Sequence, residues 1–566
     1  MGASLLIIVA SLGQLDYPNL PGFEPLTIPA VVPQPNIVQP QGPVEATRVH
    51  DTTDAVAWCV QEIAARKALA PGHPQFWTAE DVLYKRFLYV PPWGSVAWHQ
   101  TNSYLVNSAV SQSGVIVLPD AFAGGWIICW DLRRLAPKDA DLKRLIQVWD
   151  LMAFPDPYFH VEVPGGKSVK CRPYVYYDGK TYQARRFIPA LHVADGYTIL
   201  EHETQSFAPL LRADYFLRRL ASTVDGGLYY HFIGFVRDGK RLTEAEIFKT
   251  VGLDVLLSRA VDGDDRAAMF QSGVTGKPRT VEQVQGAIGK ARITYDIFDE
   301  DFDAKRHPIY ELLDFVNRSR GKEIIFERAN GSFGYILTNG KGELVDVAPP
   351  NLVSDHRTPE PVTKQLYPPL SCIRCHGPDG GIRYVRNDVP ALLAGGREGD
   401  LDVFDDLTSK QNRFATVDKL ASLYAGSDKF QNEMELARIR YADFVWAATR
   451  GMGVGEKDNV VKKAAESLSQ QFGEYWYPAS PAEANISADQ AALELGYRVG
   501  KPGDGAAFLK QTLRPGRVDV TIGGVPVEFA DPSLGALRRG LTIRRSDFER
   551  VYVYAAYQIL QSRKTK

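Results

Sequence analysis

Three side chains at close spacing, Cys372, Cys375 and His376, carry the clearest chemistry in this sequence. They lie in Ser-Cys-Ile-Arg-Cys-His-Gly at residues 371–377. Two thiols three positions apart project from one face of a helical turn, where they can add to the two vinyl groups on one edge of a porphyrin. The adjacent imidazole can then bind the iron. The motif predicts one covalent haem c, tethered by Cys372 and Cys375, with His376 as the proximal iron ligand.

Two other kinds of site also use paired cysteines, namely a structural zinc site and a thioredoxin-like redox pair. Zinc needs two further Cys or His ligands at short spacing, but the nearest other histidine is His356 and no other cysteine lies within two hundred residues. A redox pair belongs in a βαβ unit, whereas this motif follows Pro368-Pro369 and a set of short apolar runs. Both alternatives stay open, and the complete motif favours haem attachment.

The ligand on the other side of the iron decides what the haem does. A methionine ligand raises the reduction potential and favours electron transfer, whereas an open position admits small ligands. Met452 lies in a glycine-rich segment, Arg-Gly-Met-Gly-Val-Gly, whose backbone can approach a flat ring closely. It is the candidate distal ligand. The alternatives are Met434, His356, His307 and no protein ligand.

Arginines and carboxylates near the motif give weaker signals. Arg374 and Arg383 flank the cysteines and are candidates for contacts with the haem propionates, because arginine forms bidentate contacts with carboxylates. A solvated surface is the alternative for both. The acidic run at residues 299–303 lacks the turn glycine and the final Glu of a calcium loop. No second metal is therefore predicted.

A β meander is expected just before the motif. Three strand-like runs between residues 323 and 348 are separated by Asn330-Gly331 and Asn339-Gly340. Asn-Gly accepts the positive φ that tight hairpin turns require. The remaining apolar patterns predict short strands at 114–118 and 126–130, helices at 431–449 and 546–562, and a hairpin at 518–529.

The stretch from residue 323 to 381, EIIFER through CIRCHGPDGG, resembles the haem segment of large, mostly uncharacterised mono-haem c-type cytochromes of planctomycete type. The upstream stretches 130–135, 210–216 and 306–312 are similar to other recurring pieces of that family. The resemblance covers about residues 80–390, and the part after Pro390 matches nothing in it. It implies covalent haem at Cys372 and Cys375, iron ligation by His376 and an exported protein. It implies no substrate.

Length and composition set the remaining limits. A chain of 566 residues is too long for one core, and interspersed helical and strand patterns predict a multi-domain α+β fold. The expected parts are a signal peptide (1–16), a proline-rich linker (17–46), an α+β domain of unknown function (47–320), the β meander with the haem-c segment (321–400), a helical domain (401–515) and a C-terminal hairpin and helix (516–566).

Charge and hydropathy bear on partners and location. The 65 basic and 67 acidic residues give a net charge of −2, which argues against nucleic acid. No apolar run approaches the ~20 residues of a membrane span. The apolar run at 3–13 has no preceding Lys or Arg, yet the proline-rich segment and the haem motif favour export. The predicted location is periplasmic, secreted or cell envelope.

The sequence therefore predicts an exported mono-haem c-type cytochrome that transfers single electrons to a redox partner protein. The alternatives are a haem enzyme, peroxidase-like or dehydrogenase-like, with an open iron site, and a haem-containing structural or binding protein of the cell envelope. Catalytic residues are unknown, and whether the chain is an enzyme stays open. Cys59, Cys129 and Cys171 allow at most one disulfide.

Overall fold

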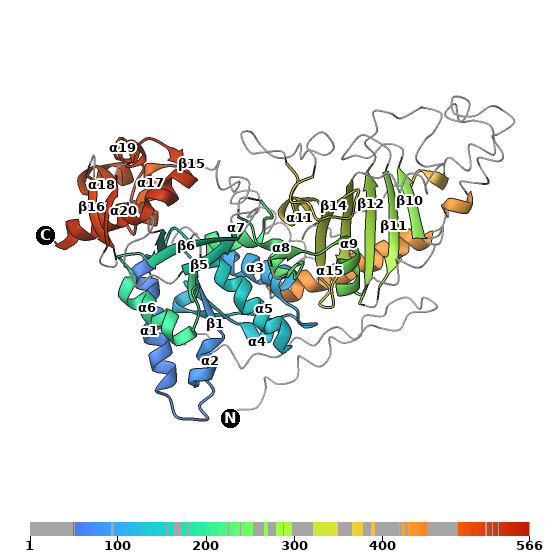
Figure 1. Cartoon of the computed structure of the whole chain (residues 1–566), viewed down its shortest axis with the longest axis horizontal. Coiled ribbons are helices and arrows are strands. Elements are labelled where there is room, and N and C mark those ends of the chain that lie inside the picture. Colours follow the sequence, from blue (N-terminus) through green and yellow to red (C-terminus); the bar gives the residue numbers. More distant parts are fainter. Residues whose placement is uncertain are drawn as a thin grey trace, which may run out of the picture.

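The computed structural model describes three bodies in a row (Figure 1): a central α+β domain, a sheet domain on one side and a helical C-terminal unit on the other. This confirms the expected mixed multi-domain fold. The description runs from residue 49 to 564 with gaps, the longer of which are 163–172, 253–264, 270–278, 297–320, 349–364, 377–386, 391–417 and 450–484. The expected signal peptide and proline-rich linker lie outside it. None of the helices it includes is long and apolar enough to cross a membrane.

The central domain is built on a four-stranded sheet of order β2-β3-β1-β7. β1 (Lys85–Tyr89) pairs antiparallel with β3 (Ile127–Asp131) and parallel with β7 (Leu210–Arg212), while β2 (Asp120–Phe122) pairs with the outer edge of β3. Every residue of β1 and β3 is buried, which requires cover on both faces of the sheet. The strand expected at 126–130 is therefore confirmed.

Helices and short strands surround this sheet. The helices are α1 (Thr52–Lys67), α2 (Ala79–Leu83), α3 (Val96–Leu105), α4 (Leu132–Leu135), α5 (Asp139–Asp150), α6 (Ala194–Thr204), α7 (Ala213–Leu220), α8 (Tyr229–Phe232) and α9 (Glu244–Thr250). The strands are β4 (His160–Glu162), β5 (Pro173–Tyr177), β6 (Tyr182–Pro189), β8 (Val236–Arg237) and β9 (Lys240–Arg241).

The strand expected at 114–118 does not form. Its backbone is held instead by one amide side chain, because Asn107 Oδ1 accepts from Val117 N (2.8 Å) and Asn107 Nδ2 donates to Val117 O (2.7 Å). Asn107 belongs to a π turn, Val106–Val110, that continues α3. A side chain thus satisfies the backbone groups that a neighbouring strand would have paired.

The sheet domain contains five antiparallel strands in chain order. They are β10 (Arg266–Met269), β11 (Arg279–Gln285), β12 (Lys290–Asp296), β13 (Gly321–Glu327) and β14 (Phe333–Asn339). Gly331 has a φ of 83° in the β13–β14 turn, as the Asn-Gly pair predicts. The domain boundary expected at residue 320 falls inside this sheet.

The third strand of the expected meander is absent, and only a single bridge joins Leu344 to Thr338. The chain turns away because its next residues bond to the central domain. Val345 O accepts from Tyr230 Oη (2.9 Å), and the Asp346 carboxylate pairs with Arg241 (2.7 Å). Bonds to the central domain therefore take the place of a sixth strand in the sheet.

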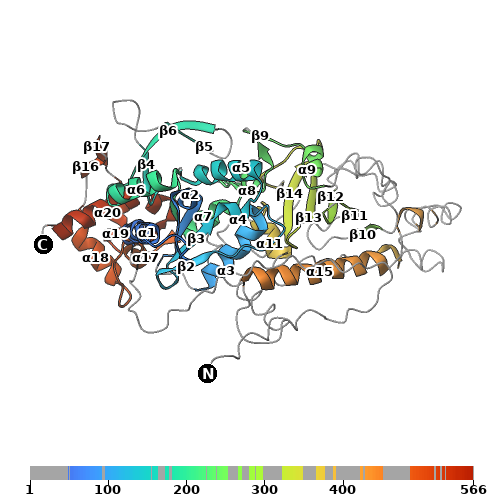
Figure 2. The ribbon, with the colours of Figure 1, turned by 90° about the horizontal axis from the view of Figure 1, so that it is seen from below.

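The two faces of the sheet have different neighbours. On one face, Phe326 lies 5.8 Å from the ring of Phe235, and Lys322 pairs with Glu244 on α9 (2.8 Å). The other face is covered by α11 (Leu370–His376) and by the long helix α15 (Asp428–Thr449), which runs across the strands (Figure 2). The helix expected at 431–449 is confirmed.

The C-terminal unit contains four helices, one hairpin and a second two-stranded pair, β15 with β18, whose strands are far apart in the sequence. The elements are β15 (Asn485–Ile486), α17 (Ala488–Glu494), α18 (Asp504–Thr512), β16 (Val518–Ile522), β17 (Val525–Phe529), α19 (Pro532–Arg538), β18 (Ile543–Arg544) and α20 (Arg545–Lys564). The expected hairpin and last helix are confirmed. Because α17 and α18 pack on α19 and α20, the boundary expected at residue 515 falls inside this unit.

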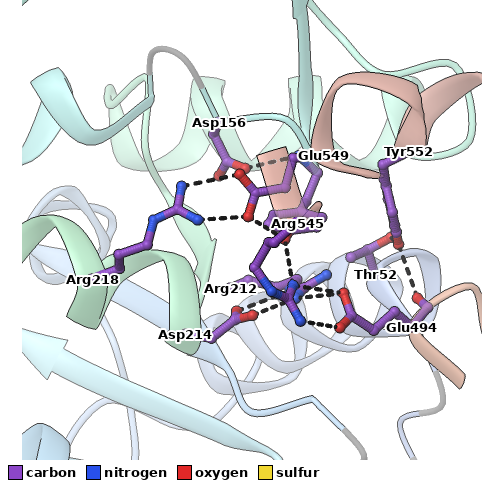
Figure 3. A network of polar contacts seen from close by, with 10 residues as sticks. Thr52, Asp156, Arg212, Asp214, Arg218, Glu494, Arg545, Glu549 and Tyr552 are labelled. Carbon is purple, nitrogen blue, oxygen red and sulfur yellow. Dashed lines mark hydrogen bonds and ion pairs between the residues drawn. The ribbon is translucent and has the colours of Figure 1, made fainter. Parts of the chain in front are cut away.

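Buried charges join the C-terminal unit to the central domain (Figure 3). Arg212 pairs with Asp214 and also with Glu494 on α17 (3.1 Å), and Arg545 on α20 pairs with the same Glu494 (2.6 Å). The side chains of Arg212 and Glu494 are 1% and 0% exposed. The Arg212 guanidinium also lies 3.4 Å from the ring centre of Tyr158. This network is a charged clamp between two domains.

Asp156 lies beside this clamp, and its carboxyl makes the stability of the fold depend on pH. Its carboxyl is fully buried, and Oδ2 has no hydrogen-bond partner among the residues described. Burial, with Asp214 and Glu549 nearby, raises its pKa to about 8. The unfolded chain binds no proton there above its ordinary pKa of about 3.9. The contribution of Asp156 to stability is therefore most favourable at low pH and is lost as pH rises to about 8.

Asp156→Asn removes this titration. Relative to the native chain, the variant should gain on the order of 1–2 kcal/mol of unfolding free energy between pH 6 and pH 8. Urea unfolding of both proteins across that range measures the difference. If the difference in unfolding free energy between the two proteins does not change with pH, the Asp156 carboxyl is not protonated in the folded protein.

Candidate functional site

The motif lies on α11, a single short helix docked on one face of the sheet. Tyr367 N donates to Ser371 Oγ (3.1 Å) just before the first cysteine, and Ile373 N donates to Pro369 O (2.8 Å). These bonds fix the start of the helix. Cys372 and Cys375 are three positions apart within it, so they share one side of the helix.

The two thiols differ in burial. Neither forms a disulfide; Cys372 is buried and Cys375 is half-buried. Burial raises the pKa of Cys372 well above its ordinary value, and the charges of Glu323 and Cys375 add to the effect. The thiolate is the reactive form of cysteine. Cys372 therefore stays a neutral thiol near pH 7.

The sheet presents two side chains to His376. Tyr335 on β14 donates its hydroxyl proton to His376 O (3.0 Å), and Glu323 Oε1 on β13 lies 3.9 Å from His376 Nε2. In the β13–β14 register, Glu323 faces Leu337 and Ile325 faces Tyr335. Paired residues share a face, so Glu323 and Tyr335 project from the same one. That face positions the histidine.

Buried tyrosines anchor this part of the sheet. Tyr335 N donates to Tyr229 Oη (2.9 Å) and Leu337 N donates to Tyr230 Oη (3.2 Å). Burial raises the pKa of both Tyr229 and Tyr230, so their hydroxyls stay protonated. Strand β14 is thereby bonded to α8 of the central domain, which fixes the strand whose Tyr335 contacts α11.

Arginines lie on the same face as Tyr335. Arg279 Nη2 on β11 is 3.8 Å from Glu323 Oε2. Arg292 on β12 pairs with Glu327 (2.8 Å) and is in register with Ile325. Arg292 Nη2 is buried without a hydrogen-bond partner among the residues described. A guanidinium N–H in that state favours an additional acceptor.

Helix α15 closes the far end of this face. Arg440 pairs with Glu327 (2.7 Å), and Tyr441 stacks on Phe333 with ring centres 4.5 Å apart. The Tyr441 hydroxyl also bonds to that of Tyr104 on α3. Met434 is buried and lies two turns before Tyr441, hence on the same side of the helix.

Several residues singled out from the sequence fall outside the description. Met452, Arg383, His356 and His307 lie in the gaps, and the side chain of Arg374 is not described. Among the residues that are described, no group of three or more His, Cys, Asp or Glu is arranged to hold a metal ion. Cys59 and Cys129 are buried free thiols, and Cys171 lies in a gap.

Sequence reasoning missed Glu323, Tyr335, Arg279 and Arg292. The available signal was the pair Glu323 and Glu327 in Lys-Glu-Ile-Ile-Phe-Glu at 322–327, an even number of positions apart in a strand-like run. The spacing places both carboxylates on one face of the strand. It does not show which helix lies on that face.

Comparison of the chain with models of protein families, with curated proteins and with solved structures found no match.

Proposed function

We propose that the chain is an exported mono-haem c-type cytochrome that passes single electrons to a redox partner protein. The observation that carries the proposal is Cys372, Cys375 and His376 on one short helix, with neither cysteine in a disulfide. Bound haem supplies a one-electron couple at its iron. Export follows because haem c is attached outside the cytoplasm.

The two cysteines would hold the haem through thioether bonds. Attachment requires that the thiols do not first oxidise to a disulfide with each other. The raised pKa of Cys372 leaves little thiolate, and disulfide formation proceeds through the thiolate. Burial of Cys372 therefore supports a pair that stays reduced until haem arrives.

Glu323 would act as a positioning residue for His376. An imidazole that binds a metal through one nitrogen usually donates its other N–H to a carboxylate or carbonyl. The Glu323 carboxylate oxygen Oε1 lies 3.9 Å from His376 Nε2, so it would take this role with the iron bound at Nδ1. A carboxylate partner makes the imidazole more basic and stabilises oxidised iron. Glu323 should therefore hold the reduction potential down.

Arg292 is evidence that an anionic group binds on the same face of the sheet. Its side chain is 3% exposed, and the guanidinium nitrogen Nη2 has no hydrogen-bond partner among the residues described. A haem propionate would supply the acceptor, because guanidinium and carboxylate form charge-assisted hydrogen bonds. Arg279, whose Nη2 lies 3.8 Å from Glu323 Oε2, is a second cation on this face.

The second candidate function is a haem enzyme with an open iron site. The observation that favours it is the same Glu323–His376 pair, because a more basic imidazole also stabilises higher oxidation states of iron. An electron carrier and such an enzyme differ in whether the iron accepts small ligands.

Optical spectra of the purified protein separate the two roles. For a six-coordinate electron carrier, we expect low-spin spectra in both oxidation states that do not change with carbon monoxide or peroxide. If the reduced protein forms a carbon monoxide complex, the result supports an enzyme with an open iron site and contradicts a six-coordinate electron carrier. A colourless protein from a host that attaches haem c to a control cytochrome would contradict both.

A further inference from the structure

A cavity of about 790 Å³ lies in the central domain, away from the haem motif. Its lining includes Ala140, Lys143, Arg144 and Gln147 of α5, Leu151 just after that helix, and residues of α8 and β8. Helices α5 and α8 lie side by side (Figure 2). Its volume is within the range of small-molecule sites. None of the residues that line it belongs to the haem motif or to the sheet beneath it.

Most of the charged residues in the described lining are cations. Lys143, Arg144 and Arg237 face one carboxylate, Asp141. The fifth titratable group, His231, is neutral, because burial and the charges of Arg219 and Arg241 lower its pKa to about 3. The described lining groups therefore sum to a charge of +2, from three cations and one anion.

Arg144 is the central group of this cavity. Its Nη1 donates to His231 O (2.8 Å) and Phe232 O (3.2 Å), which fixes the guanidinium against α8. Burial lowers its pKa, the charge of Asp141 partly offsets this effect, and repulsion from Arg237 adds to it. Within the described part of the chain, no carboxylate lies at ion-pair distance from Arg144. A partly buried, fixed guanidinium of this kind is stabilised by an anion.

Apolar surface accompanies the charges. Val148, Leu151 and Val236 also line the cavity, and its volume exceeds that of a bare oxyanion. The site therefore fits a charged group attached to an apolar body.

We propose that this cavity binds a small organic dianion, with Arg144 contacting the oxyanion and Arg237 and Lys143 neutralising it. A phosphate monoester and a dicarboxylate share this chemistry, because guanidinium binds both kinds of oxyanion in bidentate fashion. The proposal does not depend on haem attachment.

Titration calorimetry of the full chain at low salt tests this site with four probes. Phenyl phosphate and phthalate carry two charges on a phenyl body, phenol carries the body without charge, and inorganic phosphate carries charge without the body. At least one of the two phenyl dianions should bind more tightly than both phenol and inorganic phosphate. The one that binds identifies the oxyanion, and its affinity should fall as salt rises.

Substitutions in the lining should act in opposite directions. Arg144→Gln should weaken binding about tenfold or more, and Arg237→Gln, which keeps the Arg144–α8 bonds, about threefold. Asp141→Asn should tighten binding by a similar factor. Arg438→Gln on α15, which removes an exposed arginine elsewhere, is the control. Absence of saturable binding by both phenyl dianions, or equal affinity in Arg237→Gln, Asp141→Asn and the native chain, would overturn the proposal.

Discussion

Cys372→Ala combined with Cys375→Ala is expected to abolish covalently bound haem completely, because no thiol remains on α11 to form a thioether bond. Each single variant should retain one bond and a smaller amount of attached haem. The measurement is a haem stain of the denatured chain after electrophoresis, where only covalent haem remains with the polypeptide.

Cys59→Ala is the matched control for this result. Cys59 is also a buried free thiol, but it lies on α1 in the central domain. Haem attachment should be unchanged in this variant. Equal staining of the double variant and the native chain, or loss of stain only in Cys59→Ala, would show that α11 does not attach the haem.

Glu494→Gln should be the most destabilising single change in the charged clamp. The carboxylate is 0% exposed and lies between Arg212 and Arg545. Its loss removes one carboxylate from each of two guanidinium groups at the domain boundary, while Asp214 still pairs with Arg212. Breaking a buried ion pair from one side typically costs about 3–5 kcal/mol. Urea unfolding at neutral pH measures the loss.

An exposed ion pair provides the comparison. Glu435 and Arg438 on α15 are 33% and 48% exposed, so Glu435→Gln should cost less than about 1 kcal/mol. A loss in Glu494→Gln no larger than in Glu435→Gln would contradict a buried clamp. If the C-terminal unit detaches first, we expect an early transition in the denaturation curve of Glu494→Gln that the native chain lacks.

Local patterns predicted those parts of the fold whose signals are contained in one segment. Asn330-Gly331 fixes a hairpin because the backbone at Gly331 needs a positive φ. Helix α15 and the last helix follow from apolar periodicity within about twenty residues. The haem motif is equally local, since its three functional residues lie within five positions.

Features that depend on distant partners could not be predicted in this way. Residues 343–348 are apolar enough for a strand, but Tyr230 and Arg241 of the central domain bond to them instead. Arg212 and Glu494 meet across 282 positions of sequence. Glu323 reaches His376 only because α11 docks on one particular face of the sheet. Neither composition nor periodicity contains these pairings.

The mass of the mature chain under denaturing conditions tests the central claim most directly. The protein should be produced with its own N-terminus in a host that attaches haem c to exported proteins. The account predicts a polypeptide mass increased by one haem, with the added mass on the peptide that contains Cys372 and Cys375. A mass equal to the bare polypeptide, full-length or trimmed, in a host that modifies a control cytochrome would contradict it.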